Sequence, residues 1–149
     1  MLKIGEVAPE FELSNQDGEQ VTLSGLLESG PVVLYFYPID FSPVCTAQAC
    51  AMRDNYDSAT VNGVQIVGVS PQSSDSHARF ASTHNLPFPL LADPKKNVVR
   101  AYGVDGMFGM GTRRATFLIG QDGKVQNRVV SDLMVGPHTD MLNEVVAGS

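Results

Sequence analysis

Cys45 and Cys50 are the two cysteines of the 149-residue chain, and they lie five residues apart. The preceding Ser42 and Pro43 are typical of a helix start, with a hydroxyl at the N-cap and proline at the first helical position. Cys45 is therefore expected in the first helical turn, where free N–H groups and the helix dipole favour an anion. A thiolate held there can attack an O–O bond and become a sulfenic acid. The alternative is that Cys45 is a small buried core residue.

The five-residue spacing restricts how Cys50 can react with Cys45. In an intact helix the two Cα atoms would be on the order of 8.6 Å apart, whereas a disulfide tolerates only about 4.4–6.8 Å. A bond between them therefore requires at least one turn to unwind. The first turn of a helix lacks half its hydrogen bonds, which makes it the easiest to open. The alternative is that Cys50 has no chemical role.

The sequence does not favour a metal or nucleotide site. Zinc needs three or four clustered ligands, and His77, His84 and His138 are scattered without metal-binding spacing. His77 and His84 lie in a polar segment and are expected at the surface. The glycine-rich stretch 103–111 lacks the phosphate-binding pattern. Its Met107, Phe108 and Met110 are expected to form either a mobile loop, an apolar wall near Arg114 or a patch for a partner.

Composition excludes several classes of protein. The formal net charge is −6 and no Lys/Arg-rich tract exists, so a nucleic-acid or anionic-membrane surface is not expected. The longest strongly apolar stretch, Val32 to Tyr37, is too short to span a bilayer. The first residues show no apolar core of signal-peptide length, so a cytoplasmic protein is expected.

Predicted strands and helices alternate, which indicates one α/β domain over residues 1–149 with a sheet flanked by helices. The helix after Ser42 is expected to bury Cys45, Ala49, Met52, Tyr56 and Ala59 as one stripe. The expected elements are an N-terminal hairpin (Glu10 to Leu13 and Gln20 to Leu23), a central strand (Val32 to Tyr37), a helix (Ser42 to about Thr60), a strand (Val64 to Val69), a helix (Asp75 to His84), an extended edge segment interrupted by prolines (Leu86 to Leu91), a short helix (Lys95 to Tyr102), two strands (Ala115 to Ile119 and Lys124 to Val130) and a terminal helix (His138 to Val146).

The segment from Tyr37 to Cys50 resembles the peroxiredoxin signature, in which a proline and then Thr or Ser precede the reactive cysteine. A second cysteine five residues on, in the same helix, is similar to the peroxiredoxin Q (bacterioferritin comigratory protein) subfamily. Residues Gly5 to Leu13, Leu91 to Asp93 and Arg114 to Ile119 resemble other segments of that family. The chain differs from the family pattern in having Ser42 for threonine and Val44 for glycine.

This resemblance implies a thioredoxin-like fold with a central mixed sheet and a cofactor-free peroxidase. Cys45 would be the peroxidatic and Cys50 the resolving cysteine, joined in a disulfide after reaction with a hydroperoxide. Pro38 would shield the thiolate, Ser42 would hydrogen-bond it, and the Arg114 guanidinium would lie over the site. Successive strand residues point opposite ways, so only one of Arg113 and Arg114 can face it.

The resemblance also implies recycling by thioredoxin or a glutaredoxin-like dithiol, and a monomeric protein. Two other functions stay open at this point. A thiol–disulfide exchange enzyme would need a close pair such as Cys-x-x-Cys, which the Cys45–Cys50 spacing and Ser42 argue against. A non-enzymatic thioredoxin-like binding module would have an unreactive Cys45.

Overall fold

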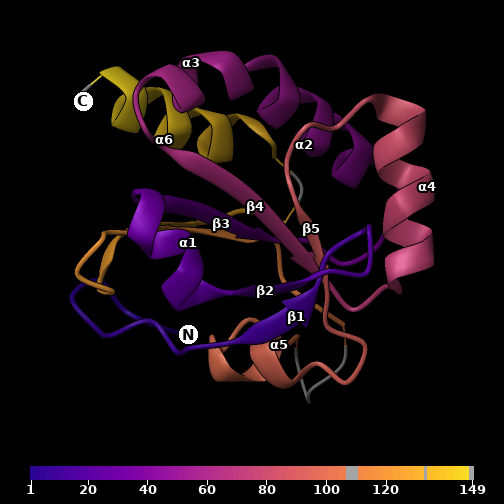
Figure 1. The fold of residues 1–149 in the computed structure, drawn as a ribbon, viewed down its shortest axis with the longest axis horizontal. Helices are drawn as coiled ribbons and strands as arrows, with labels where there is room; N and C mark the ends of the chain where they lie inside the picture. The colour runs from indigo at the N-terminus through magenta and orange to yellow at the C-terminus, as the bar shows by residue number, and fades with distance from the viewer. Residues whose placement is uncertain (107–110, 133, 148–149) are drawn as a thin grey trace.

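The computed structural model describes residues 1–106, 111–132 and 134–147. Within them a mixed seven-stranded sheet runs in the order β2-β1-β5-β4-β3-β6-β7. Helices cover both faces of the sheet, so the expected α/β fold with its N-terminal hairpin is confirmed (Figure 1). The strands are β1 (Glu12–Ser14), β2 (Gln20–Thr22), β3 (Val32–Phe36), β4 (Gln65–Ser70), β5 (Leu90–Ala92), β6 (Ala115–Ile119) and β7 (Val125–Val130). The helices are α1 (Leu23–Ser29), α2 (Pro43–Asp54), α3 (Tyr56–Val61), α4 (Ser74–His84), α5 (Asn97–Ala101) and α6 (Gly136–Ala147).

The central strand β3 leads into the loop before α2 and is buried along its whole length. It pairs in parallel with β4 and antiparallel with β6. Its alternate residues feed two cores, because successive side chains of a strand point to opposite faces. Val32, Leu34 and Phe36 belong to the core shared with α1 and α5. Val33 and Tyr35 belong to the core beneath α2, α3, α4 and α6.

The prediction that residues 86–91 lie at a sheet edge is wrong. Strand β5 pairs with β4 in parallel and with β1 antiparallel, so it lies inside the sheet. Its prolines do not prevent this, because Pro87 and Pro89 precede the strand. Pro89 also still has a carbonyl, which accepts a hydrogen bond from the Gly68 N–H at 3.0 Å.

The helices differ from the sequence prediction in two places. The expected long helix ending near Thr60 is divided at Asn55 into α2 and α3. The Asn55 side-chain amide donates to the Ala51 carbonyl at 2.8 Å, a local bond of the kind that competes with helix continuation. Helix α1 was not predicted. It begins directly after Thr22, whose hydroxyl caps it by accepting from the Gly25 N–H at 3.1 Å.

The predicted apolar stripe of α2 and α3 packs onto the sheet. Cys45, Ala49, Met52 and Ala59 are buried and Tyr56 is half-buried. This packing fixes which side of α2 faces inward at the cysteine.

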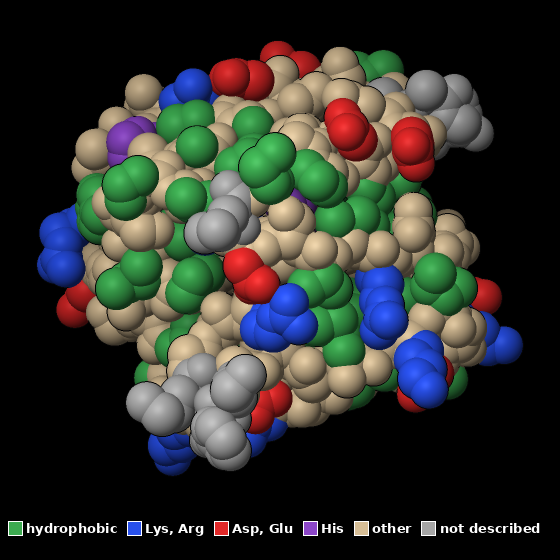
Figure 2. Space-filling model, turned by 180° about the vertical axis from the view of Figure 1, so that it is seen from behind, with side chains coloured by type: hydrophobic (Ala, Val, Ile, Leu, Met, Phe, Trp, Pro, Cys, Tyr) green, Lys and Arg blue, Asp and Glu red, His purple; other side chains and the backbone are tan. Residues whose placement is uncertain are grey.

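The surface seen from behind has no continuous basic stripe. Figure 2 shows Lys and Arg as separate groups, with Asp and Glu side chains among them. None of the helices in the described ranges is long and apolar enough to cross a bilayer.

Candidate active site

Helix α2 begins as the sequence predicts and places Cys45 in its first turn. Ser42 is the N-cap, and its hydroxyl oxygen accepts from the Cys45 N–H at 3.3 Å. The Ser42 carbonyl accepts from the Thr46 N–H at 2.8 Å. Cys45 is only 1% exposed. The Ser42 hydroxyl also lies 3.4 Å from the Ile39 carbonyl, to which it donates. In this geometry Ser42 acts as a helix cap.

Arg114 lies directly against the Cys45 sulfur. It comes from the residue before β6, the antiparallel neighbour of β3, and is 3% exposed. Its Nη2 donates to Cys45 Sγ at 3.1 Å, and its Nη1 donates to Gln48 Oε1 at 2.6 Å. Its Nε donates to the Asp132 carbonyl at 3.2 Å. The guanidinium is therefore held on three sides with one nitrogen aimed at sulfur.

Arg113 points the other way, toward solvent. Its side chain is 46% exposed and pairs with Asp132 Oδ2 at 2.9 Å. The hydrogen bond from Arg113 holds the pKa of Asp132 below its ordinary value, with help from the Arg114 backbone N–H. Asp132 thus contacts both arginines, Arg113 through its carboxylate and Arg114 through both its carboxylate and its carbonyl.

This arrangement places a positive charge against the buried Cys45 sulfur. A charge in the protein interior is costly unless it is paired and hydrogen-bonded, and Gln48 and the Asp132 carbonyl accept hydrogen bonds from the guanidinium. A guanidinium stays charged at any working pH. The neighbouring Tyr35 is fully buried. Burial raises its pKa well above the ordinary value, and the nearby Cys45 makes the second-largest contribution. Tyr35 therefore stays protonated beside the sulfur.

Cys50 lies on the same helix as Cys45, and both are free thiols in this structure. Five residues of intact helix separate their Cα atoms by more than a disulfide permits. Cys50 is half-buried, and its Sγ lies 4.0 Å from Nδ1 of His84, the last residue of α4. Pro38 is half-buried in the loop between β3 and α2.

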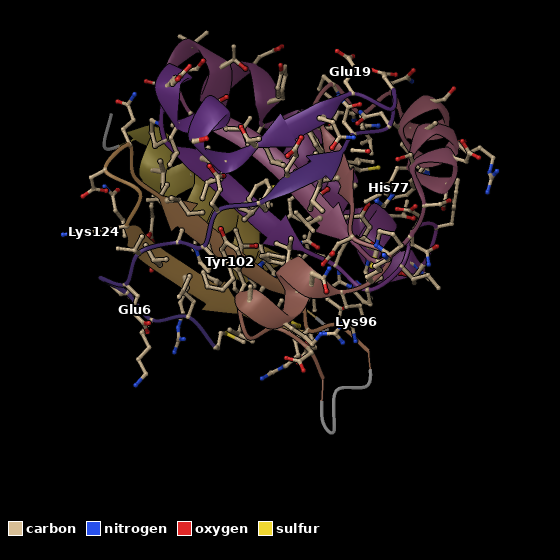
Figure 3. The ribbon with its side chains drawn as sticks, turned by 60° about the horizontal axis from the view of Figure 1, so that its bottom comes forward. Glu6, Glu19, His77, Lys96, Tyr102 and Lys124 are labelled. Atoms are coloured by element: carbon tan, nitrogen blue, oxygen red, sulfur yellow. The ribbon has the colours of Figure 1, made fainter. Side chains whose placement is uncertain are left out.

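The prediction that His77 lies at the surface is wrong, because His77 is completely buried. It lies on the side of α4 that faces the sheet (Figure 3). Its Nδ1 donates to Asp40 Oδ2 at 2.7 Å and its Nε2 faces the Leu91 carbonyl at 3.1 Å. Asp40 also accepts from Tyr37 at 2.7 Å and from Ser76 at 2.7 Å. His84 is half-buried rather than exposed.

Sequence reasoning also missed Gln48, which receives an Arg114 hydrogen bond. It stands three residues after Cys45 on α2, a spacing that puts both on one face of a helix. That spacing was the available signal. No local sequence signal pointed to Asp132, because it follows β7 and meets Arg114 only through the pairing of β6 with β7.

Within the described ranges no group of three or more His, Cys, Asp or Glu side chains could hold a metal ion. Met107, Phe108 and Met110, for which several roles were considered, lie outside the described residues.

The fold and site define a thioredoxin-fold protein with a buried cysteine at a helix start, held against an arginine. Residues 4–128 match the model of the AhpC/TSA family, and the chain belongs to this family.

Named relatives lie close in sequence and in structure. The chain is 39% identical over 147 residues to peroxiredoxin Bcp of Escherichia coli strain K12, covering 95% of this chain and 93% of the relative. It is 43% identical over 123 residues to chloroplastic peroxiredoxin Q of Sedum lineare, covering 82% of this chain and 66% of that longer relative. The crystal structure of peroxidoxin BcpB from Mycobacterium tuberculosis superposes with a TM-score of 0.92 at 34% identity, covering 99% and 98% of the two chains.

Proposed function

We propose that the protein is a thiol-dependent peroxidase that reduces hydrogen peroxide and organic hydroperoxides through Cys45. The observation that carries this proposal is the 3.1 Å contact between Arg114 Nη2 and the Cys45 sulfur at the start of α2. It joins a nucleophile to a fixed positive charge in a buried site. The relatives named peroxiredoxin Q and Bcp support the same activity.

The first step is attack of the Cys45 thiolate on one oxygen of the hydroperoxide. The O–O bond breaks, an S–O bond forms, and the other oxygen leaves with a proton as water or an alcohol. Negative charge moves from sulfur to the leaving oxygen. The Arg114 guanidinium, held by Gln48 and Asp132, stabilises the charge at both ends of this displacement.

The second step is formation of the Cys45–Cys50 disulfide with loss of water. Because α2 as observed holds the thiols too far apart, its first turn must unwind before the bond can form. An external dithiol protein, thioredoxin or a glutaredoxin-like reductant, then restores both thiols. No cofactor takes part in this scheme.

The loop before α2 completes the proposed site. Pro38, half-buried between β3 and α2, shields the sulfur from water. The Ser42 hydroxyl, now a cap, turns toward the sulfur and the peroxide when substrate enters.

We propose further that the protein is a single domain, monomeric and located in the cytoplasm. The E. coli relative's name carries no compartment, whereas the Sedum relative is named chloroplastic.

The test is peroxide consumption with a thioredoxin system as reductant. Cys45→Ser is expected to abolish turnover. Cys50→Ser is expected to permit one turnover per chain and to leave Cys45 as a sulfenic acid. Full activity of Cys45→Ser would rule the proposal out. Insulin reduction measured in parallel separates a peroxidase from a general thiol–disulfide exchange enzyme, which would reduce insulin without consuming peroxide.

A further inference from the structure

Cys50 has a titratable neighbour that the scheme above does not use. Its Sγ lies 4.0 Å from Nδ1 of His84, which is within hydrogen-bond distance for sulfur. The two residues come from different helices, α2 and α4, which lie side by side in Figure 1. A free thiol is only a few per cent ionised at neutral pH. Attack by Cys50 on a sulfenic acid therefore needs a group that takes its proton.

The His84 ring is fixed in place by aromatic contacts. It packs edge-on against Phe80 of its own helix, with ring centroids 5.2 Å apart. Phe41, from the loop before α2, lies 6.3 Å from the same ring. An imidazole held in this way keeps its orientation toward Cys50.

The His84 backbone is tied to the helix that carries Cys50. Arg53 of α2 donates from Nη1 to the His84 carbonyl at 2.8 Å. Arg53 follows Cys50 by three residues, so this bond anchors the turn after Cys50. Unwinding of the first turn of α2 can therefore bring Cys45 toward Cys50 while Cys50 stays beside His84.

The charged groups around His84 are few among the described contacts. From α2 it faces Cys50 and Arg53, and Arg53 is paired with Asp54 at 3.1 Å. Its neighbours from α4 and the loop, Phe80 and Phe41, carry no charge. A proton accepted by His84 would lie at the C-terminal end of α4, where the helix dipole favours positive charge.

We propose that His84 is the general base that takes the Cys50 proton as Cys50 attacks the Cys45 sulfenic acid. The new S–S bond forms as the S–O bond of Cys45 breaks. The leaving hydroxide takes up the proton held by His84 and departs as water, so the imidazole returns to its neutral form. This inference rests on the proposed peroxidase function, but it concerns only the resolving step.

The test is rapid mixing of reduced protein with hydrogen peroxide, quenched by thiol alkylation and followed by mass analysis. Wild type is compared with His84→Gln, His84→Ala and the control Thr83→Ala, an exposed neighbour on α4. Formation of the Cys45 sulfenic acid is expected at the wild-type rate in all of them. Disulfide formation is expected to be about 100-fold slower at pH 7 in both His84 variants.

Two readouts separate base catalysis from a structural effect. The rate defect of His84→Gln is expected to shrink as pH rises toward about 9, where a free thiol ionises without help. Added imidazole is expected to accelerate His84→Ala. Normal resolution at pH 7, or a defect equal at all pH values and insensitive to imidazole, overturns the role of His84. Failure of wild-type Cys45 to be oxidised would instead overturn the proposed function itself.

Discussion

Asp40 and His77, 37 residues apart in sequence, form a buried pair with 2.7 Å between Oδ2 and Nδ1. Asp40 belongs to the loop that leads into α2, and His77 belongs to α4. Both nitrogens of His77 face oxygen atoms, Oδ2 of Asp40 and the Leu91 carbonyl. The pair thereby fixes the loop that carries Pro38 and Ser42.

The same loop contains Phe41, whose φ of 66° is in the left-handed region that an aromatic residue rarely adopts. Such a conformation persists only when its surroundings impose it. The adjacent Asp40 is held by its hydrogen bonds. The Phe41 ring itself packs against Phe80 and His84.

Breaking this pair is expected to destabilise the protein strongly. His77→Leu leaves the Asp40 carboxylate buried without its His77 partner, and removing one partner of such a buried pair typically costs about 3–5 kcal/mol of unfolding free energy. Denaturant unfolding of the reduced protein measures the loss. Ser82→Ala, at an exposed position of α4, is the control and should change stability by no more than about 0.5 kcal/mol. A loss below about 1 kcal/mol for His77→Leu would contradict the anchoring role.

The lowered pKa of Asp40 also predicts that stability falls in acid. Burial works against its carboxylate, but the hydrogen bonds and charge of His77, aided by Ser76 and Tyr37, outweigh it and lower its pKa. The folded state therefore binds a proton less readily than the unfolded state. The stabilisation is fully present above about pH 4, the ordinary value for Asp, and is lost as pH falls through the lower folded value. Unfolding free energies measured from about pH 5 to about pH 2 should fall less steeply for Asp40→Asn than for the wild type.

His138 is expected to make stability depend on pH in a higher range than Asp40 does. It is buried, accepts from or donates to Thr116 Oγ1 at 2.6 Å through Nδ1, and faces the Ser131 carbonyl at 2.9 Å through Nε2. Burial lowers its pKa, assisted by the positive charge of Arg114. The unfolded chain then binds the proton more readily, so stability declines as pH falls below about 6.5. His138→Gln should flatten the stability curve between about pH 7 and 5, and an unchanged slope would contradict this assignment.

Arg114 is expected to control the peroxide step. Arg114→Met removes the donor at the Cys45 sulfur and should slow sulfenic acid formation by about 10²-fold or more. Arg113→Gln is the matched control, because it changes the adjacent arginine, whose exposed side chain points away from the site. Its rate should stay within a few-fold of wild type. A larger effect at Arg113 than at Arg114 would show that the wrong guanidinium has been assigned.

Ser42 tests whether the hydroxyl does more than cap α2. Ser42→Ala loses the cap, which costs about 1 kcal/mol, and also loses the proposed contact with sulfur and peroxide. Ser42→Asn retains capping ability, and Ser42→Thr retains the hydroxyl. The proposal expects Ser42→Thr to restore the peroxide rate and Ser42→Asn to restore stability alone. If Ser42→Asn restores the rate as well, Ser42 serves only as a cap.

The sequence predicted the elements whose signals are local. Ser42 and Pro43 marked the start of α2, and the apolar run of β3 marked the central strand. The prediction that β5 lies at a sheet edge is wrong because the edge preference of proline does not apply here: Pro87 and Pro89 precede the paired residues.

The burial of His77 was missed for a different reason. The composition of α4 is polar, yet His77, Phe80, Ala81 and His84 follow the spacing of one helical face. Reading that periodicity, rather than the polarity, would have placed both histidines inward. Their partners, Asp40 and Cys50, are 37 and 34 residues away, and only the tertiary fold brings them together.

The most direct test of the central claim is reaction of the reduced protein with one equivalent of hydrogen peroxide, quenched at millisecond intervals and mapped by mass analysis. The chain has no tryptophan, so this readout is preferable to fluorescence. We expect sulfenic acid to appear first at Cys45 and to be replaced by a Cys45–Cys50 disulfide. Oxidation that begins at Cys50, or a Cys45 thiol that survives unmodified, would contradict the account.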